Sequence, residues 1–258
     1  MIGRIAKLFR YALAVWLPGG RRRCLLCGNA VWRFMPYRRG ARSVQPLSRA
    51  LEVIGSDVEN FACPRCWAHD RERHLLLYLR AVDLLDKMAG NAVLHFAPEK
   101  RLQPVIEAAR PASYVKADLF PANADVRCVD ILAMPFGDRS FDFLIANHVL
   151  EHVADDLKAL AEIRRVLRVG GYAILQTPYS PRLIRTWQDD GIDSDEARLL
   201  AFGQEDHVRL YGRDIFERFA SVGLQSLVAR HEELLPDLDS ARFGVNPLEP
   251  FFLFRRTD

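Results

Sequence analysis

The chain has 258 residues, half of them hydrophobic, which is enough for one sizeable core and one small appendage. No run reaches the roughly 18 apolar residues that a membrane-spanning helix needs. The net charge of +3 conceals an asymmetry, because residues 1–80 carry 15 Lys and Arg against 5 Asp and Glu, whereas residues 81–258 carry 21 against 28. The basic N-terminal part favours a phosphate-bearing partner: nucleic acid, an anionic membrane surface or a phosphorylated substrate.

Residues 1–17 predict a short amphipathic helix. It belongs to a basic N-terminal segment that we expect to span residues 1–20. Its apolar face and its basic face comprise Ile5, Leu8, Phe9, Ala12 and Trp16 against Arg4, Lys7 and Arg10. Two interpretations stay open, a helix lying on an anionic membrane surface and a helix docked on the body or frayed at the terminus. Arg10 interrupts the apolar run and no small-residue cleavage motif follows, which disfavours a cleaved signal peptide.

The next segment, residues 21–70, is poor in helical periodicity and has a Cys-x-x-Cys pair at each end. Two such turns can bring four thiolates to one ion, so we expect a structural zinc site made by Cys24, Cys27, Cys63 and Cys66. The 35 residues between the pairs exceed the spacing of a compact zinc ribbon and imply an inserted loop. Redox-active dithiols and cysteines without a role are the alternatives. His69 and His74 lie close enough to substitute as ligands, but four thiolates already close the site.

The same cysteine usage, with Cys128 standing alone, indicates a reducing compartment, so we expect a cytoplasmic protein, with a peripheral membrane contact as an option. Residues 71–88 predict one helix whose leucines pack on a sheet. From residue 91 onward, strands and helices alternate, which predicts a doubly wound α/β body over residues 71–258. The expected strands cover residues 92–97, 113–117, 126–130, 141–146, 172–177, 224–230 and 251–255.

Residues 141–178 are the most informative stretch. They read as a buried strand, a polar turn, an amphipathic helix, a stop at Gly170 and Gly171, and a second buried strand, with the inner helix face made by Val153, Leu157, Leu160 and Leu167. This is one βαβ unit of a parallel sheet. Ligands sit at the carboxyl ends of the strands in such sheets, which places a site at Asn147, His148, Glu151 and His152.

The sequence of this stretch resembles that of class I S-adenosylmethionine (SAM)-dependent methyltransferases, in particular the type 11 group that includes quinone-biosynthesis methyltransferases. The shared run is matched by Pro135, Phe136, Phe141, Asp142, Leu150, Glu151, His152, Gly170 and Gly171. Several matches in one order over about forty residues are more specific than a lone glycine motif. The resemblance implies a seven-stranded, mostly parallel, Rossmann-like sheet and SAM as the cofactor, with an N-terminal zinc-ribbon-like segment added.

The main departure from that family lies after the first strand of the body. The family usually has an acidic residue followed by Gly-x-Gly there, whereas this chain has His95, Phe96, Ala97, Pro98 and Glu99. If the cofactor binds, His95, Ala97 and Glu99 must replace the glycine turn, with Ala97 small enough for close approach. A protein that has kept the fold and lost the cofactor would also look like this.

The resemblance places further cofactor contacts at later strand ends. Asp118, with Leu119 after it, falls where a carboxylate accepts both ribose hydroxyls. Asp130 falls where the family has an acidic residue beside the adenine amino group, and Ile131 supplies apolar cover. We also assign Asn147 to the cofactor pocket.

Methyl transfer needs placement of the acceptor and removal of its proton, for which one general base is enough. We rank His207, in a stretch that resembles the family's HVR-x-Y run, slightly above His152 as that base. Tyr179 and Tyr211 are further polar candidates near the same rim. For each histidine, capping a helix or bonding a backbone carbonyl is the alternative role.

The resemblance thus implies a SAM-dependent methyltransferase acting on a small-molecule or glycan-like acceptor, with transfer to oxygen, and with the zinc segment covering or presenting the substrate. An RNA methyltransferase with a zinc-ribbon substrate module is an alternative that the basic N-terminal part supports. Nucleic acid is the less favoured partner, because no RNA-binding motif accompanies the charge. A third alternative, from another class, is a non-catalytic zinc-dependent adaptor.

Overall fold

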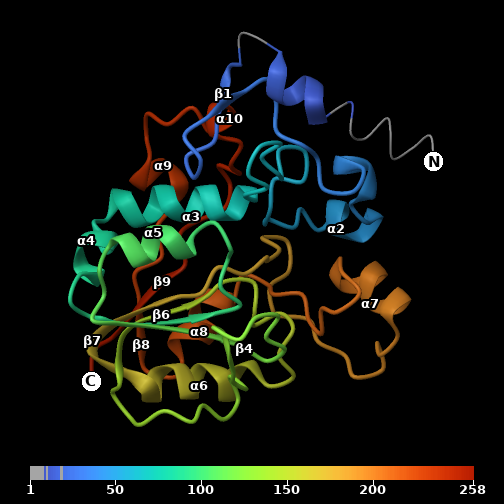
Figure 1. Ribbon diagram of the computed structural model, residues 1–258. Helices are drawn as coiled ribbons and strands as arrows, with labels where there is room; N and C mark the ends of the chain where they lie inside the picture. Colours follow the sequence, from blue (N-terminus) through green and yellow to red (C-terminus); the bar gives the residue numbers. More distant parts are fainter. Residues whose placement is uncertain (1–8, 10, 18–19) are drawn as a thin grey trace.

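The computed structural model describes residue 9, residues 11–17 and residues 20–258, and its largest feature is a seven-stranded sheet (Figure 1). The strand order is β5-β4-β3-β6-β7-β9-β8, in which β9 runs antiparallel to both neighbours and the other pairs are parallel. This confirms the predicted doubly wound, mostly parallel fold. The strands are β3 (Ala92–Phe96), β4 (Ser113–Asp118), β5 (Arg127–Cys128), β6 (Phe141–Ala146), β7 (Leu167–Ile174), β8 (Leu224–Ser226) and β9 (Leu253–Arg256).

Alternate side chains of the central strands enter two separate cores, one on each face of the sheet. In β6, Leu144 and Ala146 point into one core while Phe143 and Ile145 point into the other. All four are buried, as expected for a central strand covered on both faces. The nearly continuous run of apolar residues in this strand follows from burial on both faces.

Helices cover both faces of the sheet (Figure 1). The helices α3 (Asp70–Ala81) and α5 (Gln103–Ala108) contribute to one core, and α6 (Asp156–Val166) and α8 (Ile215–Ala220) contribute to the other. The prediction of one helix over residues 71–88 is wrong, because α3 ends at Ala81 and α4 (Leu84–Met88) begins after Asp83, whose φ of 56° is left-handed. Three further helices lie in the C-terminal part, α7 (Asp195–Phe202), α9 (His231–Leu234) and α10 (Ser240–Phe243).

The glycine pair does not stop α6. That helix ends at Val166, and Arg256 donates hydrogen bonds to the terminal carbonyls of Arg164 (2.8 Å) and Leu167 (2.7 Å). Gly170 and Gly171 lie inside β7, next to a register shift against β6. A Cβ on Gly171 would lie 2.9 Å from two backbone oxygens, so close strand approach requires glycine there. The prediction for the inner face of α6 is also wrong at two positions, because Leu167 belongs to β7 and Leu157 is exposed.

The N-terminal part forms a small layer above the edge of α3 (Figure 1). It contains the antiparallel strands β1 (Arg22–Arg23) and β2 (Ala30–Val31), the 3-10 helix η1 (Gly40–Ser43) and α2 (Pro46–Ala50). It is joined to the body by paired main-chain hydrogen bonds between Ile54 and Tyr179, at 2.8 and 3.0 Å. The boundaries drawn at residues 20 and 70 stay predictions.

Most of the predicted N-terminal amphipathic face lies outside the described residues, including Ile5, Leu8 and all three of its basic residues. Residues 11–16 are helical, and Phe9 and Trp16 are exposed by 63% and 79%. Among the described residues, none of the helices has the length and apolar character needed to cross a membrane.

Candidate active site and metal centre

The four paired cysteines come together in one cluster. The Sγ atoms of Cys24 and Cys66 lie 3.6 Å apart, those of Cys27 and Cys63 lie 4.0 Å apart, and all four sulfurs lie within 4.8 Å of one another. A tetrahedral zinc ion with Zn–S bonds of about 2.3 Å holds its sulfurs roughly 3.8 Å apart. The spacing therefore fits a zinc ion and is too long for disulfide bonds.

Two matching turns present the thiolates. Gly28, at φ 70°, donates its N–H to the Cys24 carbonyl at 2.9 Å, and Trp67, at φ 65°, donates to the Cys63 carbonyl at 2.9 Å. The buried guanidinium of Arg73 anchors the second turn, because it donates to the carbonyls of Ala68 and Gly244 at 2.8 and 2.7 Å. This contact ties the cysteine cluster to the far C-terminal part of the chain.

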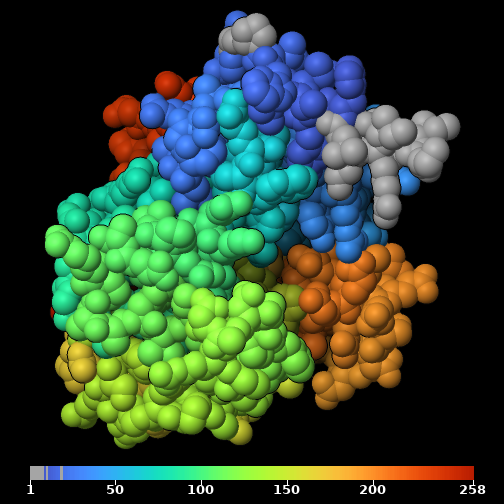
Figure 2. All heavy atoms as spheres, viewed as in Figure 1, coloured from blue at the N-terminus to red at the C-terminus, as the bar shows by residue number. Residues whose placement is uncertain are grey.

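A cavity of about 630 Å³ opens at the carboxyl ends of β3, β4 and β6. Figure 2 shows the hollow between the yellow-green surface that follows β4 and the orange surface near α7. Its volume lies within the range of roughly 300–1,000 Å³ that is usual for small-molecule sites. The lining is mostly apolar, with few polar groups: Phe96, Ala97, Asp118, Leu119, Phe120, Val129, Asp130, Ile131, Leu132, His148, Val149, His152, Val153, Ala154 and Asp206.

The structure brings five of the eight predicted cofactor residues to this cavity, namely Ala97, Asp118, Leu119, Asp130 and Ile131. Each aspartate uses one oxygen in a local turn. Asp118 Oδ1 accepts from the N–H of Phe120 at 2.9 Å, and Asp130 Oδ1 accepts from the N–H of Leu132 at 2.8 Å. These turns hold both carboxylates at the cavity wall, with further lone pairs available to a ligand.

The other three predicted residues lie beside the cavity. Glu99 and Asn147 line a small adjoining pocket, joined by a 3.1 Å hydrogen bond from Asn147 Nδ2 to Glu99 Oε1. His95 lines neither space. Its buried ring lies between the Tyr114 hydroxyl (2.8 Å) and Glu99 Oε2 (2.7 Å), so His95 orients Glu99 from behind. His148 lines both spaces.

Glu99 is one of the charged groups of the small pocket. Burial raises the pKa of this carboxyl, but the charge and hydrogen bond of His95 outweigh burial and lower it to about 2. Ala97, two residues earlier, has a left-handed φ of 45°. This strained turn and the ionised Glu99 occupy the place of the glycine turn that the family usually has.

The two candidate histidines lie against each other at the other end of the cavity. The rings of His152 and His207 are 4.8 Å apart and nearly perpendicular. His152 lies in the turn between β6 and α6 and not at the start of the helix. It lines the cavity and its side chain is 32% exposed, whereas His207 is buried and is not among the lining residues. The cavity lining therefore does not support ranking His207 above His152 as the group that touches an acceptor.

Arg209 clamps the two loops that carry these histidines. Its fully buried guanidinium donates to the carbonyls of Leu150 and Ala154 at 2.7 and 2.8 Å, and also to that of Val153. Val208 adds a main-chain bond of 2.9 Å to the Glu151 carbonyl. Because of this clamp, the position of His207 beside His152 is fixed by the backbone.

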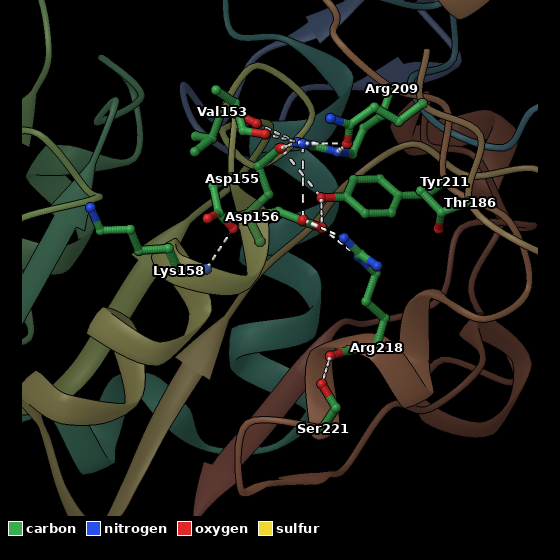
Figure 3. Close-up of polar contacts among 12 residues, drawn as sticks. Val153, Asp155, Asp156, Lys158, Thr186, Arg209, Tyr211, Arg218 and Ser221 are labelled. Atoms are coloured by element: carbon green, nitrogen blue, oxygen red, sulfur yellow. Dashed lines mark hydrogen bonds and ion pairs between the residues drawn. The ribbon is translucent and has the colours of Figure 1, made fainter. Parts of the chain in front are cut away.

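The clamp continues into α6 through a buried carboxylate. In Figure 3, Arg209, Tyr211 and Arg218 converge on Asp156, the first residue of that helix. The Tyr211 hydroxyl donates to Asp156 at 2.9 Å, and Arg218 forms two bonds of 2.6 and 2.7 Å with it. Burial raises the pKa of Asp156, but its hydrogen bond to Arg218 and the nearby charges lower it overall. Tyr211 is thus a positioning group with no route to an acceptor.

Sequence comparison finds a similarity to a known family over part of the chain. Residues 73–175 match the family model described as "Methyltransferase domain". The match covers less than half of the chain. The match includes β3, β4, β6, β7 and α6, and thus most of the cavity wall.

Curated proteins share short stretches with the chain. A 37.1 kDa protein of transposon TN4556 from Streptomyces fradiae is 41% identical over 30% of this chain and 21% of its own length. An uncharacterized methyltransferase of Schizosaccharomyces pombe is 40% identical over 19% of this chain and 18% of its own length. The chain spans a quarter or less of the curated relatives it matches.

Solved structures also resemble the chain. The crystal structure of the YcgJ protein from Bacillus subtilis is 16% identical, with a TM-score of 0.44, and covers 74% of this chain and all of its own.

Sequence analysis did not assign several polar residues to the small pocket beside the cavity. Arg71 and His74 of α3 line this pocket together with Gln176 and Glu249. An arginine and a histidine three residues apart on the otherwise apolar face of α3 were the available signal. No sequence pattern marked Glu249, because it lies in an irregular segment before β9.

The clamp gives a stability prediction. Replacing Arg209 with methionine withdraws a donor from three carbonyls, so we expect a loss of at least the roughly 1–3 kcal/mol that one unsatisfied buried acceptor costs. The free energy of unfolding in urea measures it. Arg230→Met is the matched control, because Arg230 is exposed and its ion pairs with Glu232 and Glu233 lie at the surface. A loss in Arg209→Met no larger than in the control would contradict the clamp.

Proposed function

We propose that the protein is a SAM-dependent methyltransferase that methylates an oxygen atom of a small-molecule or glycan-like acceptor. The observation that carries the proposal is the 630 Å³ cavity, because two carboxylates stand at neighbouring strand ends on its wall. This is the place where open α/β sheets bind nucleotide-like ligands. The matched methyltransferase domain includes the same strands.

The residues of the cavity fit the adenosyl part of SAM. Asp118, at the end of β4, would accept the ribose hydroxyls with the lone pairs that its local turn leaves over. Asp130 would accept from the adenine amino group, and Ile131 and Leu132 would cover the ring. Leu119 and the 83% exposed Phe120 form the outer lip.

The side chains of the small pocket have the chemistry to bind the methionyl end, which carries an ammonium and a carboxylate. The ionised Glu99 would pair with the ammonium, and Asn147 holds Glu99 in place. Arg71 offers the opposite charge, and its Nε is buried without a hydrogen-bond partner among the described residues. Charges of both signs in one pocket are what a zwitterionic end requires. This arrangement supports cofactor binding without the glycine turn and argues against the adaptor hypothesis.

Bound SAM would supply an electrophilic methyl group on a sulfonium. The protein must then hold the acceptor in line with that methyl and take its proton. His152 is placed for this on the cavity wall, with His207 behind it. Both remain our candidates for the residues that activate the acceptor.

We further propose one structural zinc ion bound by Cys24, Cys27, Cys63 and Cys66. Four thiolates leave no open coordination position, so this ion would stabilise the fold and take no part in the chemistry. Four unbridged cysteines also suit a reducing compartment such as the cytoplasm. A peripheral contact of the basic N-terminal segment with anionic membrane stays part of this proposal.

The cofactor test is SAM binding by an Asp118→Ala variant. Loss of a charged acceptor for the ribose hydroxyls should weaken binding by about 1.5–3 kcal/mol, roughly 10–150-fold in Kd. Asp125→Ala is the matched control, because Asp125 is exposed and pairs with Lys116 away from the cavity. Isothermal titration of both variants and the parent decides the matter. Equal affinity in all three would mean that the pocket is misplaced, and no binding in the parent would support the adaptor.

The acceptor is identified by methyl transfer from labelled SAM to a fractionated lysate. Label in small molecules or lipid-linked glycans supports the proposal. Label in RNA supports the alternative that the basic N-terminal part favours, in which the zinc segment presents the substrate.

A further inference from the structure

A second group of metal-ligating side chains lies at the acceptor end of the cavity. One ligand atom each from Glu151, His152 and His207 lie within 4.8 Å of one another. The three residues come from two loops that the Arg209 clamp holds together. The group is separate from the cysteine cluster, which is the other such group among the described residues.

Two of these residues have buried atoms without a partner. Glu151 is 1% exposed and His207 is 4% exposed, yet Glu151 Oε2 and His207 Nε2 form no hydrogen bond within the described chain. A buried carboxylate oxygen and a buried ring nitrogen are costly when unpaired, and native structures usually satisfy them. Both atoms belong to the same small group, so one ligand between them would satisfy both.

The opposite ring nitrogens are already engaged. His207 Nδ1 lies 3.2 Å from the Phe202 carbonyl, and His152 Nδ1 lies 3.2 Å from the Asp206 carbonyl. A carbonyl only accepts, so a neutral ring at either position carries its proton on Nδ1 and offers the Nε2 lone pair to a metal ion. Metal-binding histidines are usually oriented in this way by a second-shell acceptor. His148 Nδ1, 3.3 Å from Glu151 Oε1, orients the carboxylate similarly.

We propose that Glu151, His152 and His207 bind one divalent metal ion of the class that takes imidazole and carboxylate ligands, such as Zn²⁺, Co²⁺, Fe²⁺ or Mn²⁺. Three protein ligands leave coordination positions open, as in catalytic and not structural metal sites. These positions face the cavity, because His152 lies on its wall together with Asp206. Ligand atoms about 2.1 Å from a tetrahedral ion lie roughly 3.4 Å apart, so the partly exposed His152 moves inward on binding.

The ion gives the proposed acceptor oxygen a specific partner, and this step rests on the proposed function. An acceptor hydroxyl bound at an open position loses its proton to water more readily, because the ion stabilises the resulting oxyanion. The oxygen's electron pair then forms the bond to the methyl carbon, and the electrons of the breaking carbon–sulfur bond go to sulfur. The two histidines act as ligands in this scheme, so the proton goes to water and not to His152, the group that would take it without the ion.

The test is Co²⁺ titration of the zinc-loaded full chain, followed by calorimetry and by visible absorption. We expect one Co²⁺ per chain without thiolate-to-cobalt charge-transfer bands, and one retained zinc by elemental analysis. His207→Gln and His152→Gln should each weaken Co²⁺ binding by at least the 10–100-fold that loss of a second-shell partner costs. The partly exposed His152 provides the readout if the His207 variant folds poorly.

Asp118→Ala is the matched control, because it should lose SAM affinity and keep Co²⁺ affinity. Absence of Co²⁺ binding in the parent, or unchanged binding in both histidine variants, would overturn the inference. Full methyl transfer by protein that holds only the cysteine-bound zinc would overturn it too and leave the proposed function standing. Co²⁺ binding by a parent that binds no SAM would defeat the function and leave the metal site standing.

Discussion

Replacing Cys24 and Cys63 together with serine is expected to abolish zinc binding and to unfold much of residues 21–70. Two of four ligands and one member of each turn are lost, and structural zinc binding is worth about 10–16 kcal/mol in small zinc modules. Elemental analysis of the purified chain gives the zinc content, and limited proteolysis reports the loosened segment. The parent should hold one zinc per chain.

The structure extends this expectation beyond the zinc segment. Ser180 donates to the Leu51 carbonyl at 2.6 Å, next to the paired bonds of Ile54 and Tyr179. We therefore expect faster proteolysis near residue 180 in the variant, while the sheet stays folded on its own cores. Cys128→Ser is the control, because Cys128 is exposed in β5, outside the cluster. Zinc retained at the parent level in the double variant would exclude the proposed ligands.

Replacing His152 with glutamine is expected to lower kcat by about 10²–10⁴-fold, or roughly 3–5.5 kcal/mol in barrier height, and to leave SAM affinity nearly unchanged. The reason is its place on the cavity wall, at the end away from the aspartates that would hold adenosine. Single-turnover kinetics with labelled SAM measure the first quantity and calorimetry the second.

His69→Gln serves as the control for this change of residue type, because His69 stacks on Phe61 and lines neither the cavity nor the small pocket. Weaker SAM binding in His152→Gln, at an unchanged rate from the bound state, would make His152 a wall of the cofactor pocket. Full activity in both His152→Gln and His207→Gln would leave proximity or Tyr179 as the account of catalysis.

The sheet could be predicted from the sequence because its strands are buried on both faces and their sequences are therefore short runs of apolar residues. Phe141–Ala146 is the clearest case, and it coincides with β6. The helix boundaries were less accessible. Nothing local marks Asp83 as left-handed, and a glycine pair after a helix normally suggests a stop, whereas here it permits close contact inside β7.

The candidate site was predictable to the extent that its residues follow strands. Asp118 and Asp130 do so, and their position at one edge follows from the parallel order. The contact between His152 and His207 depends on long-range bonds of Arg209, which no local pattern reveals. Likewise, His95 was assigned to the cofactor because it precedes the turn, but the pleat of β3 turns it to the opposite face, toward Tyr114.

The segment between β7 and α8 is fixed at both of its ends. Ser180 donates its N–H to the Tyr211 carbonyl at 2.8 Å, and Trp187 pairs with Leu210 through two bonds of 2.9 Å. Residues 189–202, which include α7, form an insertion whose two ends are joined by these hydrogen bonds. Such an insertion can be lengthened, shortened or exchanged between homologues at little cost in stability, because each doubling of a flexible loop costs only about 0.6 kcal/mol. Changes of length in residues 189–202 would thus leave the cavity wall as it is, because none of these residues lines the cavity.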